Sequence, residues 1–206
     1  MLKKLRYGLP YQPPTVEGTV TATGFHGGAT WSGASFDPTT GWLYVNTNNV
    51  LYINKLNPDG KGHYDFDGYT YFYDKFGYPA NKPPWGNLTA VNLNDGTFAW
   101  RITLGAYPEL LAKGIPPTGT ENFGGTIVTE GGLVFIGATK DEKFHAFDKT
   151  TGKLLWEYQL PFGGYTTPCT YMVNGKQYVT IATGGGGKLR TKSGDRFVTF
   201  ALPSGK

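Results

Sequence analysis

The sequence is poor in the residues and runs on which several common site types depend. Cys169 is the single cysteine among 206 residues, which excludes an internal disulfide and a four-cysteine zinc site. The three histidines, His26, His63 and His145, share no metal-ligand spacing, so no zinc site is expected. Cys169 follows Thr167 and Pro168 in an apolar stretch, and we expect it to be a core thiol rather than a nucleophile.

Long apolar runs and blocks of charge are also missing. No apolar run reaches 18 residues, so no membrane-spanning helix is expected. The basic start Met1–Arg6 is followed by Tyr7–Pro10 where a signal peptide needs an apolar segment, and we expect no export signal in the chain as written. Charged residues make up 17%, and the net charge of +4 is spread without a block longer than Lys3-Lys4. Nucleic acid is therefore not an expected partner.

Turn-forming and aromatic residues are abundant instead. The chain has 31 glycines, 14 tyrosines, 13 phenylalanines and 5 tryptophans. Short β-branched and aromatic runs alternate with Gly, Asp, Asn and Thr turns, which is typical of an all-β protein. Helical periodicity is nowhere sustained, and only Pro108–Lys113 could form a single turn of helix.

The stretch Glu121–Pro161 reads as one complete four-stranded antiparallel meander. Its strands are expected at 126–129, 133–136, 144–148 and 154–160, with polar or glycine turns between them. In the last turn, Asp148 can bond the backbone and Gly152 can take positive φ. Trp156 then emerges to pack against a neighbouring sheet.

Partial copies of this unit lie on either side. The stretch Leu88–Trp100 repeats the strand, the polar turn and the tryptophan at a distance of 56 residues, which is the period of a sheet-sized repeat. Before Leu88, two strands flank a D-P-T-T-G turn at 37–41, and Asn48–Leu56 is expected to be the third strand of that sheet. After Pro161, the N-G pair in Val173–Lys176 predicts a hairpin.

We therefore predict an all-β partial β-propeller of about three four-stranded antiparallel blades. Residues 1–19 would form an extended arm and residues 20–206 the propeller. The blades would span about 20–104 with an insertion at 55–87, then 120–161, then 165–203. Three blades leave two apolar faces bare, so missing blades or self-association are expected to complete the ring.

Several features allow a second interpretation. Asp65, Asp67 and Asp74 could suggest a Ca²⁺ loop, but the later acidic ligand is missing and solvated turns are favoured. The run Gly184–Lys188 is similar to a phosphate loop, but Leu189 stands where Ser or Thr is needed, which favours an inter-strand loop. Asp141 could approach the central axis or cap its turn.

Four stretches together resemble the pyrroloquinoline-quinone (PQQ) dehydrogenases, which are eight-bladed propellers, and specifically the membrane-type glucose dehydrogenases. The stretch Asp148–Trp156 is similar to their tryptophan-docking motif. The other stretches are Gly77–Gly86, Gly119–Gly125 with Gly132–Thr139, and the ending from Asn174 to Pro203. The resemblance runs in unbroken order from about Phe25 to Pro203.

This resemblance implies oxidation of a sugar or alcohol hydroxyl with PQQ and Ca²⁺ as cofactors, and a ubiquinone or cytochrome as electron acceptor. In the family, the base aspartate and the Ca²⁺ ligands come from earlier blades, so no catalytic residue and no metal ligand is carried over to this chain. The rim of the PQQ pocket is carried over, at residues that the family places near the cofactor or the substrate entrance: Thr30, Trp31, Trp85, Asn122, Phe123 and Gly124. Trp31 and Trp85 could equally be core residues.

Two functions of different classes follow. The first is the C-terminal part of a PQQ-dependent sugar or alcohol dehydrogenase, inactive alone, whose family works on the periplasmic side, in part membrane-associated. The second is a non-catalytic propeller-repeat module that acts as a scaffold. Such a module would share the tryptophan repeats but would not need the stretches at 81–86 and 121–125.

Overall fold

The computed structural model describes residues 2–8, 11–29 and 31–203 and is almost entirely β. Three antiparallel sheets follow one another along the chain. The first contains β2 (Ser35–Asp37), β3 (Trp42–Asn48), β8 (Gly86–Asn92) and β9 (Phe98–Thr103). The second contains β10 (Ile127–Val128), β11 (Leu133–Ile136), β12 (Lys143–Asp148) and β13 (Leu154–Gln159). The third contains β14 (Cys169–Val173), β15 (Lys176–Thr183) and β16 (Arg196–Phe200).

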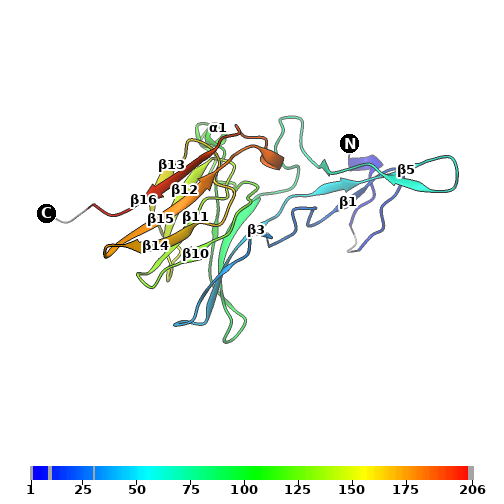
Figure 1. The fold of residues 1–206 in the computed structure, drawn as a ribbon. Coiled ribbons are helices and arrows are strands. Elements are labelled where there is room, and N and C mark those ends of the chain that lie inside the picture. The colour runs from blue at the N-terminus through cyan, green and yellow to red at the C-terminus, as the bar shows by residue number, and fades with distance from the viewer. Residues whose placement is uncertain (1, 9–10, 30, 204–206) are drawn as a thin grey trace.

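The remaining elements project from these sheets. β1 (Thr19–Thr21), β4 (Tyr52–Asn54) and β7 (Thr70–Tyr71) form a small sheet, and β5 (Leu56–Pro58) pairs with β6 (Tyr64–Phe66). Figure 1 shows β1 and β5 extending away from the stacked sheets, on the side where the N-terminus lies. Three short helices complete the described chain: η1 (Leu2–Lys4), α1 (Pro108–Leu111) and η2 (Gly187–Leu189).

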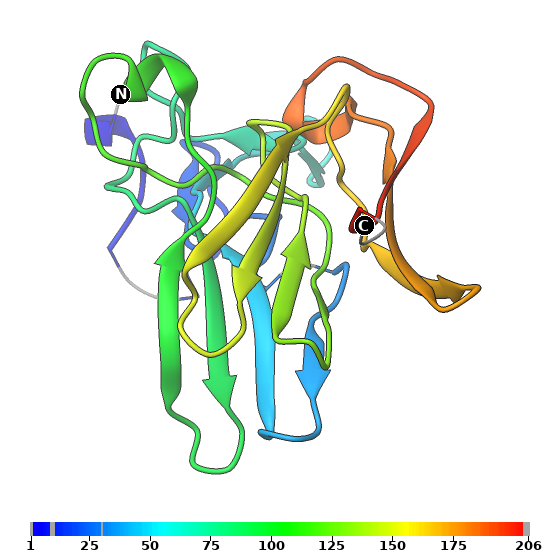
Figure 2. The same ribbon diagram turned by 90° about the vertical axis from the view of Figure 1, so that its left-hand side faces the viewer.

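The partial propeller is confirmed, with two corrections inside it. The third strand of the first sheet is Gly86–Asn92, because β3 pairs with β8 from Trp42↔Asn92 to Asn48↔Gly86. The expected strand Asn48–Leu56 instead contributes Tyr52–Asn54 to the sheet of β1 and β7. The third sheet has three strands among the described residues rather than four. Figure 2 shows this orange sheet standing apart from the other two.

The first and second sheets share one apolar core. It contains Tyr44, Leu88 and Ala90 from the first sheet and Val134, Ile136 and Phe147 from the second. Trp100 of β9 reaches across, and its Nε1–H donates to the carbonyl oxygen of Lys149 at 3.0 Å. Lys149 in turn binds the buried Asp37 carboxylate, with 2.8 Å between Nζ and Oδ2. The outermost strand of one sheet is thus fixed to the turn of the next.

The second and third sheets are joined less tightly. Phe144, Leu160, Val179 and Ile181 form their common core. A cleft of about 840 Å³ remains between the two sheets, and Trp156 and Phe200 are among the residues that line it. Trp156 contacts the Phe200 ring at 5.0 Å but stays 38% exposed.

Cys169 corrects the expectation of a core thiol. It lies on β14 as the sequence indicates, but it is exposed. All five residues of β14 are exposed, because no further element of the described chain covers that strand. The apolar sequence of the strand was therefore a correct signal for β structure and a wrong signal for burial.

Candidate functional site

The segment Glu121–Gly124, which connects the first sheet to the second, is held by buried amide groups. Asn122 is fully buried, and its Oδ1 accepts a hydrogen bond from Asn46 Nδ2 at 2.7 Å. The backbone N–H of Asn122 donates to Asn48 Oδ1 at 2.8 Å, and its own side-chain Nδ2 donates to the Thr47 carbonyl at 3.1 Å. These bonds link the segment to β3 and fix the direction in which the next residue, Phe123, projects.

Phe123 and Trp31 form an aromatic platform. Their ring centres lie 5.1 Å apart and the rings are nearly parallel, at 26°. Phe123 is buried beneath, whereas Trp31 is 67% exposed. The Trp31 side chain is therefore accessible to a ligand or partner. Thr30, the neighbouring predicted residue, lies outside the described residues.

Gly124 lets the backbone approach closely behind the platform. Its φ is +115°, and an added Cβ would lie 2.9 Å from the Thr166 carbonyl oxygen. Its N–H donates to Ser32 Oγ at 3.1 Å, which links it to the loop that carries Trp31. A side chain at this position would collide with the backbone of Thr166.

His26 supports the platform from below, a role that no sequence pattern predicted. Its ring meets Phe123 edge-on at 4.5 Å. Its Nε2 lies 2.8 Å from the Tyr52 hydroxyl and 2.9 Å from the Tyr71 hydroxyl. Burial, followed by the charge of Lys188, lowers the pKa of His26 to about 4, so the ring is neutral at pH 7. Its buried Nδ1 has no hydrogen-bond partner among the described residues.

Lys188 of η2 is the cation at the edge of the platform. Its Nζ lies 5.3 Å from the centre of the Trp31 ring and 4.7 Å from the centre of the Tyr69 ring. The Tyr71 hydroxyl donates to the Lys188 carbonyl oxygen at 3.4 Å. Lys188 and Trp31 are 157 positions apart in the sequence. No local pattern could have joined them.

Trp85, the remaining predicted pocket residue, lies apart from the platform in the core cluster of the insertion. It is buried, its Nε1–H donates to the Asn81 carbonyl oxygen at 2.8 Å, and its ring packs on Tyr78 and Tyr107. The structure therefore brings Trp31, Asn122, Phe123 and Gly124 together and sets Trp85 beside a different hollow.

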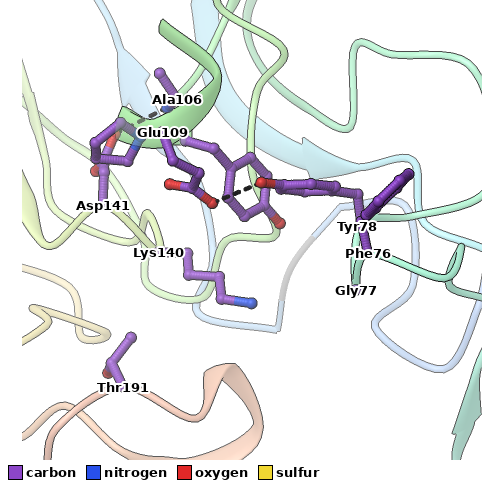
Figure 3. Close-up of a pocket in the computed structure, with 10 residues that line it drawn as sticks. Phe76, Gly77, Tyr78, Ala106, Glu109, Lys140, Asp141 and Thr191 are labelled. Carbon is purple, nitrogen blue, oxygen red and sulfur yellow. Dashed lines mark hydrogen bonds between the residues drawn. The ribbon is translucent and has the colours of Figure 1, made fainter. Parts of the chain in front are cut away.

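That hollow is a pocket of about 260 Å³ between α1, the insertion and the turn at Lys140 (Figure 3). The Tyr78 hydroxyl donates to Glu109 Oε1 at 2.9 Å on one side of it. Asp141 Oδ2 accepts the Ala106 N–H at 2.9 Å, and its Oδ1 accepts the hydroxyl of Thr139, so its carboxylate caps the turn. Lys140 projects into the pocket.

Glu121 is a buried acid behind this pocket. Its Oε1 accepts a hydrogen bond from the Tyr73 hydroxyl, and its Oε2 lies 3.7 Å from Lys140 Nζ. Burial, followed by the charge of Glu121, raises the pKa of Tyr73, so this tyrosine stays protonated and remains a donor to the carboxylate. Glu121 thus joins the platform segment to the pocket wall.

Two further properties of the described residues bear on function. They contain no group of three or more His, Cys, Asp or Glu side chains placed to hold a metal ion. None of their helices has the length and hydrophobicity that a bilayer crossing requires.

The successive antiparallel sheets, with an open aromatic surface at the loops that join them, define a portion of a β-propeller. Residues 1–179 match the PQQ family described as "Glucose/ethanol/alcohol dehydrogenase, beta-propeller domain". The chain belongs to this family.

Individual relatives agree with this assignment. The chain is 34% identical to quinoprotein glucose dehydrogenase A of Acinetobacter calcoaceticus, over 99% of this chain and 28% of the relative. It is also 34% identical to the glycerol dehydrogenase large subunit of Gluconobacter thailandicus, over 98% of this chain and 32% of the relative. The chain thus spans less than a third of the length of either relative.

A solved structure shows the same arrangement of strands. The quinohemoprotein alcohol dehydrogenase from Comamonas testosteroni superposes with a TM-score of 0.62 at 28% identity, covering 85% of this chain and 26% of that one. The agreement in fold extends over most of the chain.

Proposed function

We propose that this chain forms the C-terminal blades of a PQQ-dependent dehydrogenase and that the platform of Trp31 and Phe123 is part of the wall of its PQQ site. The observation that carries the proposal is the exposed indole of Trp31, stacked on Phe123 at 5.1 Å, in two segments that match the family's pattern. Residues 20–206 would be the propeller part, preceded by the arm at 1–19.

The platform fits the chemistry of PQQ, a flat fused-ring molecule that carries three carboxylates. A flat ligand of this kind gains most from a parallel aromatic ring, and the indole of Trp31, which is 67% exposed, is accessible to provide one. Asn122 would act indirectly, because its amide is used in holding the segment against β3. PQQ, when bound, supplies an electrophilic quinone that accepts two electrons from the alcohol carbon.

Substrate and acceptor are proposed from the relatives. Relatives named for glucose, glycerol and alcohol support a sugar or alcohol hydroxyl as the substrate. Ubiquinone or a cytochrome would take up the electrons, on the periplasmic side. Ca²⁺ would be held by residues of other blades, as would the catalytic base, so the chain alone is expected to be inactive. Trp100 and Trp156 would serve as the tryptophans that dock blade to blade.

A reconstitution tests this proposal directly. The purified chain is mixed with PQQ, Ca²⁺, glucose and a dye acceptor, alone and together with the N-terminal part of Acinetobacter calcoaceticus quinoprotein glucose dehydrogenase A. We expect PQQ-dependent dye reduction only in the mixture. Absence of both PQQ binding and turnover in every preparation would refute the proposal.

Two matched variants then test the platform. Trp31→Leu should weaken PQQ binding by roughly two- to tenfold, the range of an aromatic stacking contact. Phe197→Leu removes an exposed ring on β16, distant in the sequence from the platform, and should leave PQQ binding unchanged. Equal affinity for Trp31→Leu and the unaltered chain would remove the platform from the PQQ site.

A non-catalytic scaffold is the second candidate, and the bare apolar side chains of β13, β14 and β16 favour it. Leu155, Met172 and Phe197 are all more than half exposed. A scaffold would associate with itself or another β-protein through these strands and would not bind PQQ. Size measurement in solution, combined with the PQQ titration, separates the two candidates.

A further inference from the structure

Lys188 lies against two aromatic rings. Its Nζ lies 5.3 Å from the centre of the Trp31 ring and 4.7 Å from the centre of the Tyr69 ring. None of the described carboxylates forms an ion pair with it. A lysine held against aromatic rings keeps its full charge available to an incoming anion.

The position of Lys188 is built into the fold. Leu189, the next residue, is buried and anchors η2. The preceding glycine loop is tightly packed: Gly185 donates its N–H to the Gly163 carbonyl at 2.9 Å, and an added Cβ there would lie only 2.0 Å from the Lys192 carbonyl oxygen. The Tyr71 hydroxyl holds the Lys188 carbonyl from the side of the insertion. The glycine loop therefore places the ammonium group of Lys188, between two strands of the third sheet, beside the platform.

His26 and the two tyrosines beneath the platform do not compete with Lys188 for an anion, and the positive charge of Arg190 acts on the neighbouring Tyr71. His26, beneath the platform, is neutral at pH 7 and offers no positive charge of its own. Tyr52 and Tyr71 direct their hydroxyl groups towards His26 Nε2. Trp31 has a ring contact with Phe123 and a cation–ring contact with Lys188, and Lys188 is the charged one of these two partners.

We infer that Lys188 binds a carboxylate of PQQ when the flat ring system of PQQ stacks on Trp31. This assignment rests on the proposed function and adds to it a residue that the family's pattern did not supply. An ammonium group beside an aromatic face matches an anion carried on a flat ring, because stacking and charge pairing are satisfied together.

The test measures equilibrium binding of PQQ, by dialysis and absorbance, to the chain alone and to the chain with the N-terminal part of Acinetobacter calcoaceticus quinoprotein glucose dehydrogenase A. Lys188→Gln should weaken binding by about tenfold, the value of one charge-assisted hydrogen bond, and Lys188→Arg should restore most of it. Lys192→Gln is the matched control, because it removes the same charge from the same loop, where Lys192 lies over the Phe162 ring.

The trimethyl ester of PQQ separates charge pairing from a change of shape. The ester lacks the carboxylate charges, so the unaltered chain and Lys188→Gln should bind it equally. The assignment of Lys188 would be overturned if both proteins bound PQQ itself with equal affinity. It would also be overturned if Lys188→Gln weakened binding of the ester as much as it weakens binding of PQQ. If PQQ also drives dye reduction in that case, the proposed function still holds. If neither preparation binds PQQ, both the assignment and the proposed function fail.

Discussion

Gly152, in the turn between β12 and β13, contributes to the contact between the first two sheets because it packs against Trp100 of β9. The indole of Trp100 packs directly on it: a Cβ added to Gly152 would lie 2.8 Å from both Cδ2 and Cε3 of that ring. Its φ of +71° is also one that side-chain-bearing residues rarely adopt. Gly152→Ala therefore introduces a steric clash and backbone strain together.

Gly96 separates these two effects. It occupies the same place in the turn between β8 and β9, with φ of +77°, but nothing lies within 4 Å of an added Cβ. Gly96→Ala should cost about 1 kcal/mol, since the strain of a left-handed residue is partly offset by a more restricted unfolded chain. Gly152→Ala adds overpacking against Trp100, which costs about 1–3 kcal/mol more.

The assay is equilibrium unfolding in urea, with the free energy of unfolding compared among the variants. We expect Gly152→Ala to be less stable than Gly96→Ala by about 1–3 kcal/mol. In a Trp100→Leu background this difference should largely disappear, because the colliding ring is gone. Equal costs of the two glycine substitutions in the unaltered background would refute the idea that Trp100 packs tightly on this turn.

Four further outcomes can be measured on the same chain. Lys149→Met should lower the free energy of unfolding by about 1.5–3 kcal/mol, because it leaves the buried Asp37 carboxylate without its charged partner. Lys143→Met breaks an exposed pair and should lower it by less than about 1 kcal/mol in the same urea unfolding. The hydrogen bond from Lys149 holds the pKa of Asp37 well below its usual value. The stabilisation from this pair is therefore complete above about pH 4 and falls at lower pH. Acid unfolding should show a smaller loss of stability over this range in Lys149→Met than in the unaltered chain. The lowered pKa of His26 predicts that stability falls as the pH drops from about 6.5 to about 4, and His26→Gln should flatten that part of the pH curve. Cys169 should react with a thiol reagent in the folded chain, and a reaction that requires denaturant would contradict its exposure.

The repeat could be predicted from the sequence because each of its signals is local. The N-G pair at Asn174 and Gly175 does form the hairpin turn between β14 and β15, with Val173 opposite Lys176. The third strand of the first sheet could not be predicted in the same way. The insertion separates Asn48 from its partner Gly86, and the nearer apolar run at Tyr52–Asn54 has the same β character. Only the pairing of whole strands decides between two such runs.

The candidate site was only partly accessible to sequence reasoning. Trp31, Asn122, Phe123 and Gly124 belong to two short stretches that could be matched to a family pattern. His26 was considered only as one of three histidines without metal-ligand spacing. Its partners Tyr52, on β4, and Tyr71, on β7 within the insertion, are 26 and 45 positions away along the chain. Their hydroxyl groups converge on it through tertiary folding alone, which no spacing along the chain encodes.

The way these segments meet explains why the insertion and the platform depend on each other. Tyr71 of the insertion contacts His26 through its hydroxyl and Lys188 of the third sheet through the backbone carbonyl. His26 supports Phe123, which begins the second sheet, and Phe123 supports Trp31. A loss of the Tyr71 hydroxyl would therefore loosen contacts to two sheets at once, although the Tyr71 ring packs on His26, Tyr52 and Tyr73 rather than on Trp31. For this reason the platform is a property of the assembled sheets and not of the two stretches that supply its rings.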